Sequence, residues 1–341
     1  MKPAAADPCF RPCVELLRHA APLERQRRAL EELLRQDSDR VIRFLSEHRI
    51  DQHIYRRALA LRPAVKLPEA LAEALQWAQR RAAVNTLMQE EAGRQVAAAL
   101  EGAGVRHVFY KGAHLGEALY GDAVVRPAAD IDVLISEEDR PAALDTLGQH
   151  GFSTVEQAGQ PPYEMALDGH GSQLDLHWHL FRPARSRQPL TQWILDSRQQ
   201  LGERWVPDDT AALAIMLLSP ALTDHVTQQL SHAIDLDRWL RSRDTDWPRV
   251  VSCLAECGLR TAAWTMLEWT RRHFATPVPQ GVLPRLAPGP LRRAYLKAWL
   301  TRDPARRYLR HPWLVRGGFS LALHDRPADM LRAVRGGRSD G

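Results

Sequence analysis

The sequence has few cysteines and no long apolar run, and each absence excludes a class of protein. Four cysteines, Cys9, Cys13, Cys253 and Cys257, are too few to hold 341 residues together by disulfides. The longest apolar stretch, 210–222, contains a proline and is too short to span a membrane. The first residues also lack the apolar segment of a signal peptide. We therefore expect a cytoplasmic protein with reduced thiols.

The cysteines nevertheless form two C-x3-C pairs. On a helix this spacing places both thiols of a pair on one face, so a shared zinc site is an alternative. Zinc knuckles more often use C-x2-C, and ligand-rich loops are missing from the sequence. Buried or surface thiols are therefore the favoured interpretation.

Charge is distributed unevenly along the chain. The total of 46 Lys+Arg against 41 Asp+Glu gives a net charge of +5. Residues 281–341 hold 13 basic and 4 acidic residues, whereas the rest of the chain carries a net charge of −4. A basic C-terminal segment of this kind can bind an anionic partner such as nucleic acid, or it can be a solvated helical face.

Hydrophobic periodicity divides the chain into three parts. With 45% hydrophobic and 26% charged residues, the composition is that of a folded globular protein. Apolar residues recur at helical spacing through 15–34 and through a long segment, 69–101, which Gly102 and Gly104 end. We expect an N-terminal helical region at 1–100, an α/β core at 101–200, and a C-terminal helical domain with a basic tail at 201–341.

The central part alternates between strand and helix patterns. Short strands are predicted at 105–110, 130–135, 163–167 and 173–181, and helices at 112–119 and 137–150. After Pro207 the chain returns to helical patterns, at 209–218, 223–241, 247–257, 259–274 and 291–301. A small α/β unit therefore lies within a mostly helical protein.

Two carboxylates mark the central strand. Asp130 and Asp132 project from one face of the strand, roughly 6–7 Å apart at Cα, while Ile131 and Val133 anchor the other face. The repulsion between the two charges is offset when a divalent cation lies between them. A D-x-D pair in an apolar strand therefore indicates a metal platform, although acidic pairs at strand ends also occur without a ligand.

Two further segments carry polar groups that can act with this pair. Lys111 and Gly112 stand where a strand joins a helix, and the free N–H groups of a helix N-terminus bind phosphate. The alternative is a tight turn with a surface lysine. Downstream, Asp175, His177 and His179 alternate on one strand face. Asp175 can be a third carboxylate, unless this face is only a polar surface.

The three segments together resemble the DNA polymerase β-like nucleotidyltransferase superfamily. The closer resemblance is to a largely uncharacterised bacterial branch with the motifs K-G-x-x-L, R-P-x-x-D-I-D and an acidic residue before L-H-W. In this sequence the motifs are 111–115, 126–132 and 175–178. The resemblance implies an α+β fold, with a small mixed β-sheet core flanked by N- and C-terminal helical domains.

The resemblance also implies a site and an activity. It implies an enzyme that moves a nucleoside monophosphate from an NTP to an acceptor, with two Mg²⁺ ions, or Mn²⁺, as cofactors. The implied catalytic and metal-binding residues are Asp130, Asp132 and Asp175. The implied nucleotide-binding residues are Lys111, Gly112, Arg126 and His177. One departure concerns donor choice: many superfamily members have Gly-Gly or Gly-Ser where this chain has Gly112-Ala113.

The resemblance leaves the acceptor open. A peptide, a small molecule or sugar, a protein hydroxyl and an RNA end are all candidates, and related bacterial branches suggest natural-product or peptide modification. A catalytically degenerate scaffold that binds a nucleotide or peptide is an alternative, as is a toxin-like enzyme that modifies tRNA or protein.

Overall fold

The computed structural model describes residues 7–19, 21–62, 64–155, 161–227, 229–301 and 310–336. The chain divides into two compact units, each described here by itself. We call them the helical unit (Met1–Ala82, Met216–Asp244 and Thr261–Leu323) and the sheet unit (Ala83–Ile215, Thr245–Arg260 and His324–Gly341).

A mixed five-stranded sheet forms the centre of the sheet unit. Its strands are β1 (His107–Phe109), β2 (Ile131–Ile135), β3 (Ser153–Thr154), β4 (Glu164–Gly169) and β5 (Ser172–His177). They lie in the order β1-β2-β5-β4-β3. The β2–β5 pair is parallel and the other pairs are antiparallel. This sheet within a mostly helical chain confirms the predicted α+β class.

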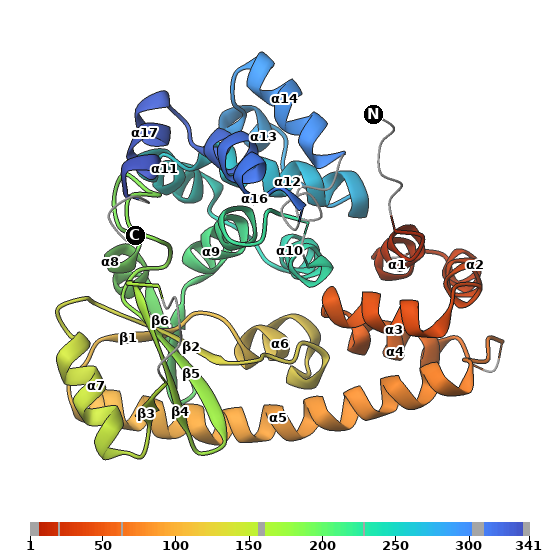
Figure 1. The fold of residues 1–341 in the computed structure, drawn as a ribbon, viewed down its shortest axis with the longest axis horizontal. Coiled ribbons are helices and arrows are strands. Elements are labelled where there is room, and N and C mark those ends of the chain that lie inside the picture. The colour runs from red at the N-terminus through yellow and green to blue at the C-terminus, as the bar shows by residue number, and fades with distance from the viewer. Residues whose placement is uncertain are drawn as a thin grey trace. The chain divides into compact units, whose positions relative to one another are not determined.

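One face of the sheet packs on two helices. The long helix α5 (Glu69–Gly102) and helix α7 (Arg140–Gln149) supply apolar side chains such as Val96 and Leu147 to a buried cluster. Val133 and Leu176 enter the same cluster from the two central strands. In Figure 1, α7 lies on one side of the sheet and α6 (Ala113–Tyr120) on the other. On β2 and β5 the residues of this cluster alternate with Asp132, Asp175 and His177, which therefore lie on the opposite face together with the buried Leu134.

Further elements complete the sheet unit. These are the 3₁₀ turn η1 (Ala123–Val125), α8 (Thr191–Asp196), the hairpin β6 (Arg198–Leu201) and β7 (Arg204–Pro207), the start of α9 (Asp209–Leu222), α11 (Trp247–Cys257) and α17 (Pro327–Gly336). The hairpin was not predicted, because its strands are rich in Arg and Gln and lack apolar alternation. Gly202, with φ +60°, forms its turn.

The helical unit is built from helices alone in its described residues. They are α1 (Phe10–Leu17), α2 (Leu23–Leu34), α3 (Ser38–Glu47), α4 (Asp51–Ala60), α10 (Leu230–Ser242), α12 (Arg260–Phe274), α13 (Val282–Leu286), α14 (Pro290–Leu300) and α16 (Pro312–Leu314), followed by short turns at Val315–Ser320 and Leu321–Leu323. Three helices, α5, α9 and α12, each have residues in both units.

Several predicted boundaries were wrong. The strand predicted at 173–181 ends at His177, and the helix predicted at 223–241 begins at Leu230. The helical pattern over 15–34 belongs to two helices, because Pro22 lies between α1 and α2 and removes a backbone donor. The three-part division at residues 100 and 200 stays a prediction. Parts of the basic C-terminal segment, 302–309 and 337–341, lie outside the described residues.

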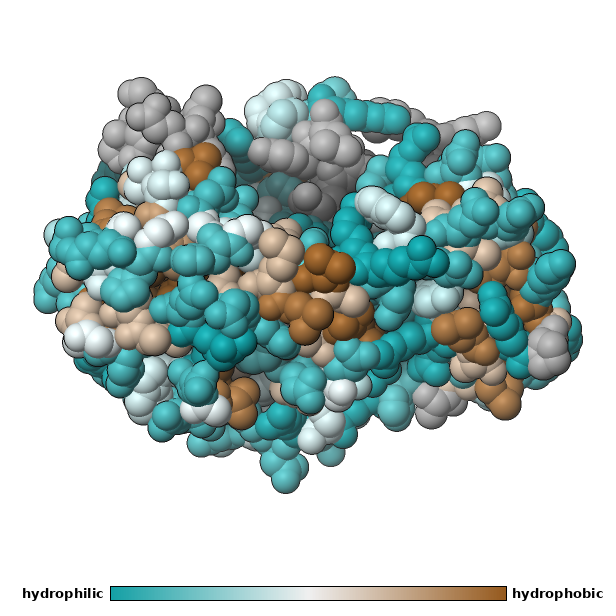
Figure 2. Space-filling view, turned by 90° about the horizontal axis from the view of Figure 1, so that it is seen from below, coloured by the Kyte–Doolittle hydropathy of each residue, from teal (hydrophilic) through white to brown (hydrophobic). Residues whose placement is uncertain are grey.

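Helix α5 also exposes apolar side chains. Val84, Leu87 and Met88 are exposed, and Figure 2, a view onto the side along which α5 runs, shows apolar side chains gathered near its middle. Throughout the described part of the chain, every helix is too short or too polar to cross a lipid bilayer.

Candidate functional site

The register of the two central strands brings the predicted carboxylates together. In the parallel pair of β2 and β5, Asp132 lies directly opposite Asp175. Cross-strand partners share a face and neighbouring strands lie roughly 4.8 Å apart, so both side chains project from the polar face of the sheet. Asp130 is half-buried and stands in a bend immediately before β2, two residues from Asp132.

Asp132 is a buried carboxylate held by cations. Its Oδ1 lies 3.6 Å from Lys111 Nζ and 3.3 Å from His177 Nε2. Burial would raise the pKa of Asp132, but the charge of Lys111 and the contacts with His177 and Tyr110 together lower it below its usual range. The carboxylate is therefore ionised at neutral pH.

His177 joins the β2 carboxylate to a second acid. Its Nδ1 lies 3.1 Å from an oxygen of Glu164, the residue opposite it on β4. Burial would lower the pKa of His177, but its contacts with Asp132 and Glu164 raise it to about 9. A protonated imidazole between two carboxylates fixes the orientation of Asp132.

Asp175 has a different environment, although it is in register with Asp132. It is half-buried, and the Gln173 side-chain amide donates a hydrogen bond to its Oδ1 at 2.8 Å. Burial raises the pKa of Asp175; the Gln173 bond opposes this rise, and the charge of Asp132 adds to it. Asp175 is thus the more readily protonated of the two carboxylates.

The glycine turn lies at the same edge of the sheet. Gly112 precedes α6 with φ +99°, a conformation that residues with a Cβ rarely adopt. A Cβ there would be 3.9 Å from the Ala128 side chain, so the backbone conformation rather than space explains the glycine. Arg126 Nη1 donates to the Gly112 carbonyl at 3.3 Å. Arg126 therefore braces the turn that leads into the N-terminus of α6, a helix end of the kind that binds phosphate through backbone N–H groups.

Buried polar residues support the turn and the loop before Asp130. The Gln89 amide on α5 donates to the Ala128 carbonyl at 3.2 Å, two residues before Asp130. Burial and the charges of Arg126 and Arg204 lower the pKa of His114 to about 3, so this histidine on α6 is neutral. Gln89 and Arg126 thus hold the loop before Asp130 and the glycine turn in place by hydrogen bonds to backbone carbonyls.

The structure brings Lys111, Asp132, Asp175 and His177 onto one polar face and adds residues that the sequence analysis missed. These are Tyr110, Glu164 and Gln173. Tyr110 immediately precedes Lys111, and Glu164 and Gln173 alternate in phase with the polar positions of their strands, which was the available signal. His179 was expected on this face, but the strand ends first, and its Nε2 pairs with Glu137 at 3.2 Å.

The carboxylates fit a divalent cation in chemistry and register. Asp130, Asp132 and Asp175 supply the oxygen donors that Mg²⁺ prefers. As the side chains stand, however, Asp132 faces Lys111 and His177. No three His, Cys, Asp or Glu side chains group to hold a metal ion within the residues that the structure describes. Metal ligation by these three residues therefore stays a prediction.

Comparison with known families agrees with this geometry. The model of a family described as an uncharacterised nucleotidyltransferase matches residues 35–275, which include the whole sheet and the polar face. The chain belongs to this family of nucleotidyltransferases. A search of curated proteins finds no match.

Proposed function

We propose that the protein transfers a nucleoside monophosphate from an NTP to an acceptor hydroxyl on the polar face of β2 and β5. The observation that most directly supports this is the parallel register that sets Asp132 opposite Asp175. The glycine turn before α6 provides a phosphate-binding helix end beside Lys111. Membership of a nucleotidyltransferase family is consistent with both features.

In this proposal the residues hold the cation, bind the triphosphate or position another residue, and Asp175 has a second role in the chemical step. Asp130, Asp132 and Asp175 would hold a divalent cation, and the bound cation would neutralise charge at the transferred phosphate. Lys111 and the N–H groups after Gly112 bind the triphosphate, and Arg126 keeps the turn in place. His177 contacts Asp132 Oδ1 through its Nε2 and so fixes the orientation of this carboxylate.

The chemical step forms one bond and breaks another. The acceptor oxygen attacks the α-phosphorus of the NTP, and the bond from that phosphorus to the pyrophosphate oxygen breaks. In this proposal Asp175 takes the acceptor proton, because the register places it opposite Asp132. The products are the nucleotidylated acceptor and pyrophosphate.

A non-catalytic scaffold is the second candidate. Lys111 and His177 already compensate the charge of Asp132, as expected if no cation were needed there. On this alternative the face would bind a nucleotide through Lys111 and the helix end without transferring it.

A binding experiment separates the two candidates. Non-hydrolysable analogues of the four NTPs are titrated into the full chain with and without Mg²⁺, using wild type and Asp130→Asn. Asp130 is half-buried, so the variant is expected to fold. Magnesium-dependent binding of an NTP that weakens at least tenfold in the variant supports the enzyme. Binding that depends on neither magnesium nor Asp130 supports the scaffold, and no binding at all rejects both.

A further inference from the structure

A cationic pocket lies just beyond the end of β5. It has a volume of about 240 Å³ and is lined by the loop that follows the strand, from His179 to Leu190, by Thr191, and by Arg332 of α17. That volume corresponds to roughly eight water molecules at about 30 Å³ each. The pocket is therefore large enough for a phosphate group together with part of the molecule that carries it.

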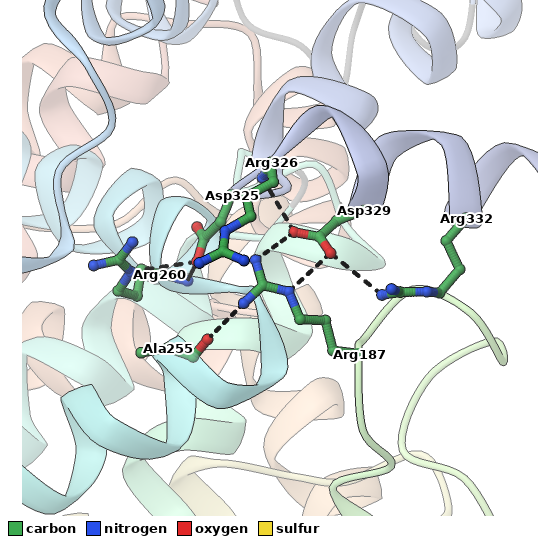
Figure 3. A network of polar contacts seen from close by, with 7 residues as sticks. All are labelled: Arg187, Ala255, Arg260, Asp325, Arg326, Asp329 and Arg332. Carbon is green, nitrogen blue, oxygen red and sulfur yellow. Dashed lines mark hydrogen bonds and ion pairs between the residues drawn. The ribbon is translucent and has the colours of Figure 1, made fainter.

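Three arginines give the pocket a positive charge. Arg182, Arg187 and Arg332 line it, and Asp329 is the buried carboxylate that holds two of them. In Figure 3 the side chains of Arg187 and Arg332 approach Asp329 from two directions. His179, which also lines the pocket, contacts Glu137 at 3.2 Å, so the carboxylates paired with lining residues are Asp329 and Glu137. Three guanidinium groups outnumber these two carboxylates and leave the pocket positively charged.

The arginines are held in place to different degrees. Arg187 donates to both oxygens of Asp329, at 2.8 and 2.6 Å, and to the Ala255 carbonyl at 3.1 Å. Arg332 contacts the same carboxylate at 3.3 Å and is largely exposed. Among the described residues, no carboxylate pairs with Arg182. Arg187 is thus structural, whereas Arg182 and Arg332 have donors available for a ligand.

The pocket adjoins the polar face that carries the candidate site. Tyr163 precedes Glu164, the partner of His177. The backbone N–H of His179, which lines the pocket, donates to the Tyr163 carbonyl at 3.4 Å. Burial raises the pKa of the Tyr163 phenol, and the charges of Arg182 and Lys111 are among those that lower it. The pocket lining is thus joined to the strand position that precedes Glu164.

The pocket and the glycine turn lie at opposite ends of the carboxylate row. Gly112 is level with Asp130, before β2 begins, whereas the pocket begins after His177, where β5 ends. His177 is itself roughly 7 Å along the strand from Asp175. In an in-line phosphoryl transfer, the attacking and leaving groups stand on opposite sides of the phosphorus. One anion site at each end of the carboxylate row therefore suits a reaction in which the NTP donor binds at the glycine turn and the acceptor binds at the pocket.

We propose that the pocket lined by Arg182, Arg187 and Arg332 binds a phosphate group carried by a small-molecule acceptor. A planar guanidinium fork matches the oxygens of a carboxylate or a phosphate in pairs. A phosphate monoester carries about −1.5 to −2 charge near neutral pH and three acceptor oxygens, so Arg182 and Arg332 can both bind it, which a carboxylate with one charge and two oxygens suits less well. The identification of the ligand as the acceptor rests on the proposed function. The binding of a phosphate in this pocket does not.

The test uses inorganic phosphate and glycerol 3-phosphate, with glycerol as the uncharged control, titrated calorimetrically into the full chain without metal or NTP. The variants are Arg182→Gln and Arg332→Gln. Arg335→Gln, on the same helix but outside the pocket, is the matched charge control. We expect glycerol 3-phosphate to bind more tightly than phosphate, and binding of both to weaken about tenfold or more in each pocket variant. Wild-type affinity is expected in Arg335→Gln.

Several results would overturn the proposal. They are undetectable binding of both anions, unchanged affinity in Arg182→Gln, or an equal loss in Arg335→Gln, which would indicate general charge attraction. Thermal unfolding checks that the variants fold; Arg182→Gln breaks no ion pair among the described residues and keeps the test valid if Arg332→Gln is unstable.

A second arm separates this inference from the proposed function. Lys111→Gln is expected to weaken NTP binding and leave glycerol 3-phosphate binding unchanged, and Arg182→Gln is expected to do the reverse. Loss of NTP binding in Arg182→Gln would instead assign the pocket to the triphosphate. If the monoester binds as expected but the chain binds no NTP, the anion pocket stands and the acceptor assignment fails with the proposed function.

Discussion

The two central strands carry carboxylates in the same register but in different surroundings. On β2, Asp132 is buried against two cationic side chains, which keep it ionised. On β5, Asp175 is half-buried, accepts one neutral hydrogen bond, and has a raised pKa. Two carboxylates whose surroundings move their pKa values apart can take different roles in one reaction. The comparison teaches that the same register does not give the same electrostatics: the pKa of Asp132 on β2 is lowered, whereas the pKa of Asp175 on β5 is raised.

Removing the charge on β2 should have the largest effect. In Asp132→Asn we expect pyrophosphate release to fall about 10²- to 10³-fold, by analogy with loss of a group that stabilises transition-state charge. The variant should also be less stable, by about 3 kcal/mol, because His177 loses one of its two carboxylate partners and Lys111 loses its contact with Asp132. Activity assays and denaturant unfolding measure the two effects. Asp145→Asn, an exposed change on α7, is the control and should alter neither.

Removing the carboxylate on β5 should affect activity without the loss of stability. In Asp175→Asn we expect about a 10²-fold lower rate, since the group that takes the proton is lost, and an unfolding midpoint close to that of wild type. The same two assays apply. A variant that unfolds as early as Asp132→Asn would show that the two strands do not differ as described.

Disturbing the link between β2 and β4 should have an intermediate effect. His177→Gln removes the cation between Asp132 and Glu164, so we expect roughly tenfold lower activity together with reduced stability. Glu164→Gln leaves the contact of His177 with Asp132 in place, so it should lower activity and stability less than His177→Gln does. Larger losses in Glu164→Gln would assign Glu164 a direct part in the site.

The hydrogen bond to Asp175 should matter least. Gln173→Met keeps the size of the side chain and removes its amide. The lost hydrogen bond is worth about 1 kcal/mol, so we expect the rate to change a few-fold. Steady-state kinetics measure it, and stability should be unchanged. An effect as large as that of Asp175→Asn would mean that Gln173 itself contacts a substrate.

Local patterns predicted the elements of the site but not their partners. The apolar alternation around Asp130 and Asp132 located β2 within one residue, and the glycines after 101 located the end of α5. Family resemblance then related the segments to one another. The boundary errors arose where a pattern continued past the element, as it did after His177, because a change of direction depends on distant contacts rather than on alternation.

The sequence by itself determined which residues are polar, which strand faces they share, and where glycine was required, since these follow from the two-residue period of a strand and from backbone sterics. Only the tertiary structure decided that β5 pairs parallel to β2, which sets Asp175 opposite Asp132, and that Glu164 approaches His177. It also brought Asp329 to Arg187, 142 residues away along the chain. Pairings at such separations depend on the packing of the whole unit, which no local pattern contains.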